Sequence, residues 1–243
     1  MNSPLGFIIA LQAERASLTR HKISHHTPTQ LASGHWVILS GVGAWNAHHA
    51  ARKLLKHGVS GLVSWGSAGS LTDTLHPGHL VIPESILGAT GDVYTADAEW
   101  RGRLIAALTT LPLAGGLLTE SLCTIAHPRD KLALNTRTNA VAVDMESAAI
   151  AAVARHSEVP FVAIRAIADT ASMTLPRSVS LSINTSGKLC LHKLMWHAAL
   201  RPDEWMALKQ LSTAFAAAHQ TLQTVNEQAV DQHFYFTRPG ICT

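Results

Sequence analysis

Short apolar runs rich in β-branched residues alternate with stretches in which apolar side chains recur at helical spacing. The first pattern predicts buried strands, and the second predicts helices that cover them. Because the strands are too apolar to have a wet face, the alternation is typical of an α/β domain with a central, mainly parallel (mixed), twisted sheet flanked by helices. Strands are predicted at 6–11, 36–40, 61–65, 80–83, 121–126, 140–143 and 160–167, and helices up to about Lys56, within 95–111, after Ser147, at 189–200 and at 203–225.

The composition predicts one domain. Of the 243 residues, 47% are hydrophobic and 14% are charged, which is enough apolar material for one sizeable core. Nothing in the chain has the composition of a linker between two cores. We therefore expect a single domain over residues 1–225, and the tail at 226–243 stays unassigned.

The charge pattern argues against nucleic-acid binding, because the formal net charge of +3 is spread along the chain without a basic stripe. Basic residues within 125–131 are predicted to lie in a solvated loop before a helix. The apolar run at 5–11 is too short to span a membrane and lacks the flanks of a signal peptide. The cysteines, Cys123, Cys190 and Cys242, form no CxxC pair, which is typical of reduced thiols. We therefore expect a cytoplasmic protein without a transmembrane segment.

Two patterns that resemble cofactor sites are incomplete. His21, His25 and His26 have spacing that a metal could use, but no carboxylate or cysteine joins them, so exposed loop histidines are predicted. The turn that begins at Gly41 resembles a dinucleotide fingerprint, but Asn46 replaces its third glycine and no acid follows about twenty residues later. We expect neither a metal nor a dinucleotide, although such a turn still offers N–H groups to an anion or a ribose.

Three acidic side chains and one serine each follow closely on a different predicted strand. They are Glu14, Ser67, Glu146 and Asp169. Ligands of open α/β sheets bind at the carboxyl ends of the strands. All four side chains are therefore expected to open onto one cleft.

Helix capping is the alternative explanation for the acids, because acidic side chains stabilise the first turn of a helix. It accounts well for Asp144, and a solvated first-turn position accounts for Glu14. It accounts less well for Glu146, because apolar residues three, four and seven positions later place Glu146 on the apolar face of its own helix. A carboxylate on that face indicates a functional site.

The motif VDMES, followed by a helix and then VPFVAIRAIADTAS, resembles the nucleoside phosphorylase and nucleosidase superfamily, which cleaves the N-glycosidic bond of purine nucleosides. The resemblance implies that Glu146 holds the ribose hydroxyls and that Met145 lies under the sugar ring. It implies that Asp169 faces the purine, where it would act in protonated form near N7. It also implies that Glu14 activates the attacking water, as in the nucleosidases, and Asp144 is included among the substrate-binding candidates.

Two glycine-containing segments extend this resemblance. The sequence GSAGS, which includes Gly66 and Ser67, is similar to the family's GSAGG turn lining the nucleophile and ribose pocket. The turn at Gly41 is similar to the family's SGxG turn. A tight turn without a ligand explains the first segment about equally well from spacing alone.

The identity of the nucleophile is left open by conflicting signals. Several phosphorylases of the family carry a phosphate-binding arginine where this chain has Ser64, and Glu14 would repel phosphate, so both favour water. The pattern ADTAS, LP and a later RP before a long helix resembles the hopanoid-associated phosphorylase branch. That longer resemblance, together with Arg15 as a candidate phosphate ligand, slightly favours phosphorolysis of adenosylhopane.

The remaining expectations follow from the same resemblance. Inorganic phosphate is a candidate co-substrate and no other cofactor is expected, and the partner is a small purine (adenine) nucleoside. A homodimer or higher homo-oligomer is expected. A hydrolytic nucleosidase acting on methylthioadenosine or adenosylhomocysteine is the first alternative, and a catalytically silent nucleoside-binding protein on the same fold is the second.

Overall fold

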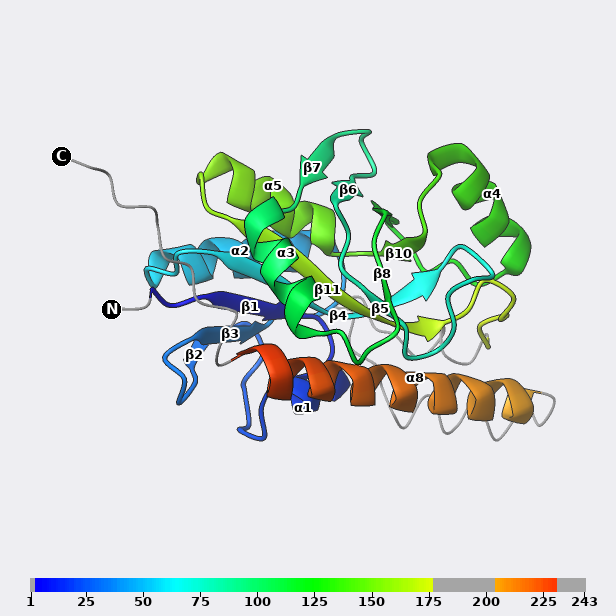
Figure 1. The fold of residues 1–243 in the computed structure, drawn as a ribbon, viewed down its shortest axis with the longest axis horizontal. Helices are drawn as coiled ribbons and strands as arrows, with labels where there is room; N and C mark the ends of the chain where they lie inside the picture. The colour runs from blue at the N-terminus through cyan, green and yellow to red at the C-terminus, as the bar shows by residue number, and fades with distance from the viewer. Residues whose placement is uncertain (1–2, 177–203, 231–243) are drawn as a thin grey trace.

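The computed structural model describes residues 3–176 and 204–230, and it has an eleven-stranded mixed sheet at its centre (Figure 1). The strands are β1 (Gly6–Ile9), β2 (Thr29–Gln30), β3 (Trp36–Leu39), β4 (Leu62–Ser70), β5 (Leu80–Val81), β6 (Ser85–Leu87), β7 (Val93–Thr95), β8 (Leu113–Ala114), β9 (Leu117–Glu120), β10 (Ala142–Asp144) and β11 (Phe161–Asp169). The helices are α1 (Gln12–Leu18), α2 (Ala44–Lys56), α3 (Ala98–Ala107), α4 (Pro128–Thr138), α5 (Ser147–His156), α8 (Trp205–Val225) and the π-helix η2 (Asn226–Val230).

The pairing of the strands confirms the predicted fold class. Strand β4 is parallel to β1 and β11, β1 is parallel to β3, and β9 is parallel to β6 and β10. Antiparallel pairs join β10 to β4, β5 to β11, and two outer strands, β2 and β7, to their neighbours. The sheet is therefore mixed and mainly parallel, as predicted.

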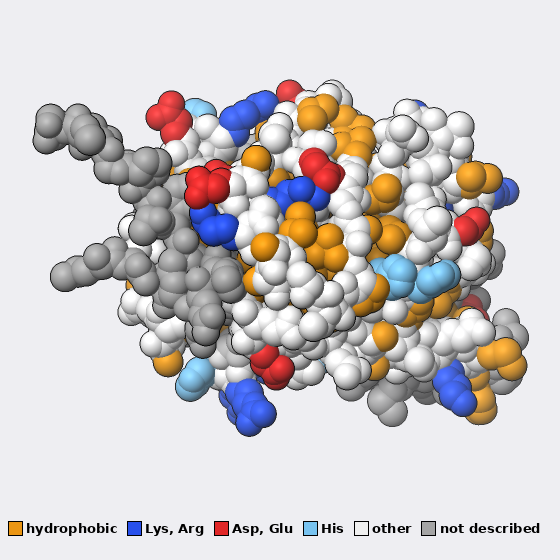
Figure 2. All heavy atoms as spheres, in the orientation of Figure 1, with side chains coloured by type: hydrophobic (Ala, Val, Ile, Leu, Met, Phe, Trp, Pro, Cys, Tyr) orange, Lys and Arg blue, Asp and Glu red, His pale blue; other side chains and the backbone are white. Residues whose placement is uncertain are grey.

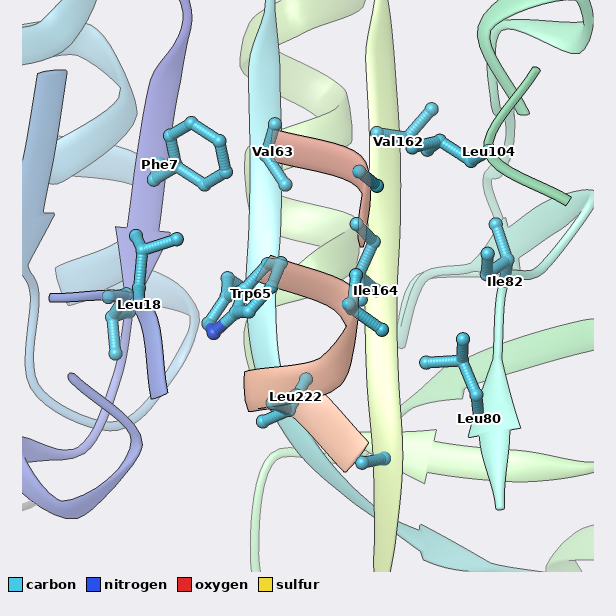
Figure 3. Close-up of a cluster of buried hydrophobic side chains, with 14 of the residues drawn as sticks. Phe7, Leu18, Val63, Trp65, Leu80, Ile82, Leu104, Val162, Ile164 and Leu222 are labelled. Atoms are coloured by element: carbon cyan, nitrogen blue, oxygen red, sulfur yellow. The ribbon is translucent and has the colours of Figure 1, made fainter. Parts of the chain in front are cut away.

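Buried apolar clusters on the two faces of the sheet hold the helices in place. Residues of α1, α3 and α8 form one cluster with the strands, and residues of α2 and α5 form another. In Figure 3, Trp65 of β4 and Ile164 of β11 lie beside Leu222 of α8, and all three side chains are buried. Because a fully buried side chain of this size contributes about 1.5–3 kcal/mol, this packing holds the two longest strands rigidly.

Strand β4 continues through the segment predicted to be a turn, so that prediction is wrong. Gly66, Ser67 and Ala68 each pair with a residue of β11, and Gly69 and Ser70 pair with β10. Glycine and serine favour turns when they are considered locally, but here two neighbouring strands satisfy the backbone groups of the segment. The small side chains of this segment leave room beside β4 for Glu14 and Arg165.

Other boundaries differ from the sequence predictions. The strand predicted at 121–126 is wrong, because β9 (Leu117–Glu120) ends before that segment and pairs in register with β6 and β10. The helix predicted within 95–111 is confirmed as α3, where Trp100 and Leu104 are buried as core residues. The helix predicted at 189–200 lies outside the described residues.

The C-terminal helix packs along the sheet, and the described chain continues beyond it. Helix α8 agrees with the predicted helix at 203–225, and η2 extends it, with Asn226 Nδ2 donating to the Leu18 carbonyl at 3.1 Å. Among the described helices, none has the length and apolar character that crossing a bilayer requires. On the face shown in Figure 2, Lys and Arg side chains lie scattered and form no stripe.

Candidate active site

The candidate site lies where the neighbours of β4 change. The first half of β4 pairs with β1, whose register ends at Ile9 opposite Trp65. The last residues of β4 pair with β10, which begins at Ala142 opposite Ser70. Because β1 runs parallel to β4 and β10 runs antiparallel to it, the carboxyl ends of β1 and β10 face each other along β4, and the residues that follow them carry acidic side chains to the middle of β4. This is the kind of switch point at which open α/β sheets bind ligands.

Glu14 lies in the first turn of α1 and contacts β4. Its Oε1 accepts hydrogen bonds from the backbone N–H of Ser67 at 2.8 Å and from the Ser67 hydroxyl at 2.6 Å. Its Oε2 accepts from the N–H of Leu11 at 3.1 Å, which caps the helix. The residue is 3% exposed, so the alternative of a solvated acid is wrong, although the capping contact is present.

Glu146 reaches across to the glycine turn that precedes α2. Its Oε1 accepts from the N–H of Gly43 at 2.8 Å, across 103 residues of sequence. Gly43 has φ of 98°, a left-handed conformation that glycine adopts at little cost, and it directs this N–H at the carboxylate. Gly41, the predicted substrate-binding glycine, begins the same turn with φ of 80°. A hydrogen bond from a residue far away in the sequence therefore fixes the position of the Glu146 carboxylate.

Arg165 of β11 is the cation at the centre of this cluster. Its guanidinium lies 2.7 Å from Asp144 Oδ2 and 3.9 Å from Glu146 Oε2, and its side chain is 2% exposed. It also donates to the Ser64 hydroxyl at 2.6 Å. Ser64, the position where several phosphorylases carry arginine, therefore accepts a hydrogen bond from an arginine of another strand.

Asp144 serves mainly as the partner of this arginine. Besides Arg165, its carboxylate accepts from the N–H and hydroxyl of Ser147 at the start of α5. The capping explanation given for Asp144 therefore agrees with the structure. Met145, between the two acids, is half-buried.

Asp144 and Glu146 share the Arg165 guanidinium, and the negative charge of Glu14 also acts on Glu146. Burial raises the pKa of Glu146 to about 7, and the charges of Asp144 and Glu14 act in the same direction. The attraction of Arg165 and the Gly43 hydrogen bond oppose that rise without cancelling it. Glu146 therefore changes its charge near neutral pH, and a positive charge placed beside it would favour its ionised form.

Asp169, at the end of β11, lies farther along β4 and has a different partner. Its Oδ1 accepts from Lys131 Nζ at 2.7 Å, while its Oδ2 lies above Gly69. Burial raises the pKa of Asp169 to about 6, with Lys131 acting in the opposite direction. Lys131 is in α4 and its side chain is 1% exposed, so the prediction of a solvated loop at this position is wrong.

Gly66 marks the crowded floor of the site. A Cβ at this position would lie 2.6 Å from an Arg165 nitrogen and 2.9 Å from each carboxylate oxygen of Glu14. A larger side chain would have to displace one of these groups, so glycine is required here for close approach. Gly66 is predicted as a ligand-lining residue, and in the structure its missing side chain gives room to Glu14 and Arg165.

The structure brings Glu14, Ser67 and Glu146 together, with Asp169 over the same strand two residues beyond Ser67. Sequence reasoning missed Arg165 and Lys131 as site residues. A single arginine inside an apolar strand was the signal for the first, because a buried charge needs a partner. Within the described residues no group of three or more His, Cys, Asp or Glu could hold a metal ion.

The chain matches known proteins in sequence and in fold. The model of the phosphorylase superfamily matches residues 4–188, which is more than half of the chain. The 5′-methylthioadenosine/S-adenosylhomocysteine nucleosidase of Anoxybacillus flavithermus is 30% identical over 200 residues, covering 68% of this chain and 84% of the relative.

Two solved structures share the fold. Futalosine hydrolase of Helicobacter pylori has a TM-score of 0.69 at 16% identity and covers 95% of this chain and 98% of its own. The 5′-methylthioadenosine/S-adenosylhomocysteine nucleosidase of Neisseria meningitidis has a TM-score of 0.65 at 22% identity, covering 93% and 100%. The fold, the VDMES and ADTAS segments and the family match agree, and the chain therefore belongs to the phosphorylase superfamily of nucleoside phosphorylases and nucleosidases.

Proposed function

We propose that the protein is a nucleosidase that hydrolyses the N-glycosidic bond of an adenine nucleoside, with Glu14 as the base that activates water. The observation that carries the proposal is the contact of Glu14, in α1, with Ser67 of β4. Its carboxylate already occupies the N–H and the hydroxyl of Ser67, the groups that would otherwise bind phosphate. All three of its partners are donors, so it acts there as an acceptor, as a base must.

Arg15, the candidate phosphate ligand, and Arg165, the arginine that contacts Ser64, both bind other groups of the protein. Arg165 forms a buried ion pair with Asp144 and donates to Ser64. Arg15 donates to the backbone carbonyls of Thr19 and His21. Among the described residues, a phosphate dianion beside Glu14 would therefore meet a carboxylate, while Arg165 is committed to Asp144 and Ser64 and Arg15 donates to two carbonyls and keeps its buried Nε without a hydrogen-bond partner, which disfavours phosphate binding.

The chemistry divides among three carboxyl groups. Departure of the purine leaves positive charge on the ribose, which ionised Glu146 stabilises, and negative charge on the base, which protonated Asp169 neutralises at N7. Water attacks the sugar carbon and loses a proton to Glu14. The Anoxybacillus flavithermus relative is named as a nucleosidase, which supports water as the nucleophile.

Phosphorolysis of a nucleoside with a large 5′ substituent, such as adenosylhopane, is the second candidate. It rests on the resemblance of the ADTAS and RP segments to the hopanoid-associated branch. The geometry around Glu14 gives it less support than hydrolysis. The 5′ substituent stays a prediction from sequence, since residues 177–203 lie outside the described part of the chain.

One assay separates these candidates. Purified protein is incubated with 5′-methylthioadenosine, adenosine and a 5′-alkylated adenosine, with and without inorganic phosphate, and the released base and sugar are identified. Full-rate release of a free sugar without phosphate supports hydrolysis. A sugar phosphate formed only with phosphate present would support phosphorolysis, and binding without turnover would support a silent binding protein. Glu14→Gln is expected to abolish hydrolysis, with Glu158→Gln as an exposed control.

A further inference from the structure

We propose that Lys131 is the positioning residue for Asp169, fixing its carboxylate for proton donation and setting the pH range in which it can donate. This inference rests on the proposed function, because it concerns the acid that protonates the leaving purine. Lys131 comes from α4, and its Nζ lies 2.7 Å from Asp169 Oδ1 across 38 residues of sequence.

All three N–H groups of the Lys131 ammonium are used within the protein. Besides Asp169, Nζ donates to the backbone carbonyl of Thr170 at 2.7 Å and to that of Met173 at 2.9 Å. A lysine ammonium has three donors, so none is left for a nucleoside. Lys131 therefore acts through Asp169 and through the segment 170–173, and it does not contact the substrate.

The ion pair leaves one carboxylate oxygen of Asp169 for the reaction. Lys131 occupies Oδ1, whereas Oδ2 lies beside Gly69, near the end of β4, and accepts no hydrogen bond from Lys131. The transferred proton therefore belongs on Oδ2. When the C–N bond breaks, its electron pair goes to the purine, the Oδ2 proton moves to N7, and Asp169 becomes a carboxylate beside the ammonium. Lys131 stabilises this product and makes Asp169 a stronger acid.

Lys131 is the charged group that alters the pKa of Asp169. Burial raises that pKa, and Lys131 lowers it by its charge and its hydrogen bond. At this point β4 presents Gly69 and β10 presents Val143, neither of which titrates. Burial lowers the pKa of Lys131, and the negative charge of Asp169 opposes this decrease. Each group therefore favours the charged form of the other.

The test uses variants that separate charge from packing. Lys131→Met and Lys131→Gln both remove the charge, the second keeping two donors, and Lys131→Arg keeps the charge. Arg129→Met is the matched control, because Arg129 is in the same helix with its side chain 84% exposed. The pH profile of kcat/KM for base release is measured, together with a ¹³C NMR titration of the Asp169 carboxyl, assigned by its absence in Asp169→Asn.

Because protonated Asp169 is the active form, its pKa sets the alkaline limb of the profile. Removing the charge is expected to move this limb and the NMR midpoint upward by about one to three pH units, while Lys131→Arg and Arg129→Met leave both in place. A uniform loss of rate in Lys131→Met and Lys131→Gln, with the limb and midpoint unmoved, would overturn the proposal. If the wild type releases no base from any nucleoside, the proposed function fails, yet the NMR titration still decides the role of Lys131.

Discussion

Replacing Glu146 with glutamine is expected to stabilise the folded protein at alkaline pH while it damages catalysis. The amide oxygen of glutamine can still accept from Gly43 N–H, so the substitution removes mainly a charge. Because the folded-state pKa of Glu146 is raised, its stabilising contribution is present at low pH and is lost as pH rises through about 7. Glutamine does not ionise, so the stability of Glu146→Gln does not fall in this way as pH rises.

The magnitude follows from the raised pKa. A rise from 4.5 to about 7 corresponds, at about 1.4 kcal/mol per pH unit, to about 3–4 kcal/mol of unfolding free energy. Most of this difference should develop between about pH 4.5 and about pH 7. The raised pKa of Asp169 acts in the same direction but is common to both proteins, so it cancels in the comparison.

Urea unfolding of the wild type, Glu146→Gln and the exposed control Glu158→Gln at several pH values measures the effect. The free-energy difference between Glu146→Gln and the wild type should grow with pH, and that for the control should stay flat. A difference independent of pH, or largest at pH 5, would refute the reasoning about the crowded carboxylates. Turnover by Glu146→Gln is expected to fall at least about a hundredfold, because the glutamine side chain carries no negative charge to stabilise the sugar.

Three further changes test neighbouring contacts. Asp144→Asn should cost about 3–5 kcal/mol in urea unfolding, because Arg165 loses its buried partner; a loss under about 1 kcal/mol would mean that the pair is dispensable. Gly66→Ala should lower kcat and also cost about 1–3 kcal/mol of stability, since its Cβ would displace Arg165 or Glu14, and unchanged kcat and stability would show that the floor is not crowded. Asp169→Asn should reduce base release at least about a hundredfold with the fold intact by circular dichroism, whereas near-normal release would remove Asp169 from the mechanism.

The sequence predicted the fold class and the strand-end acids because both depend on local periodicity. Glu14, Ser67 and Glu146 follow different strands, and parallel strands bring their ends together. The extension of β4 could not be read from composition, because Gly66 to Ser70 favours a turn until β10 and β11 pair with it.

The two missed cations show a second limit of sequence reasoning. Arg165 interrupts an apolar strand and so signalled a buried charge, but its partner Asp144 comes from another strand, at a distance that periodicity does not encode. Lys131 carried no such signal, because one basic residue near a helix start is usually solvated. Its burial depends on Asp169 and on two carbonyls that the chain brings back to α4.

The register of β4 limits how this protein can diversify. Side chains alternate between the faces of a strand, so inserting or deleting one residue in β4 would move every later side chain to the opposite face. Ser67 would leave Glu14, and Gly69 would no longer lie beneath Asp169. Insertions and deletions can therefore accumulate in the connecting loops. In β4 only substitutions keep the register, and the small residues at Gly66 and Gly69 limit which side chains can be introduced.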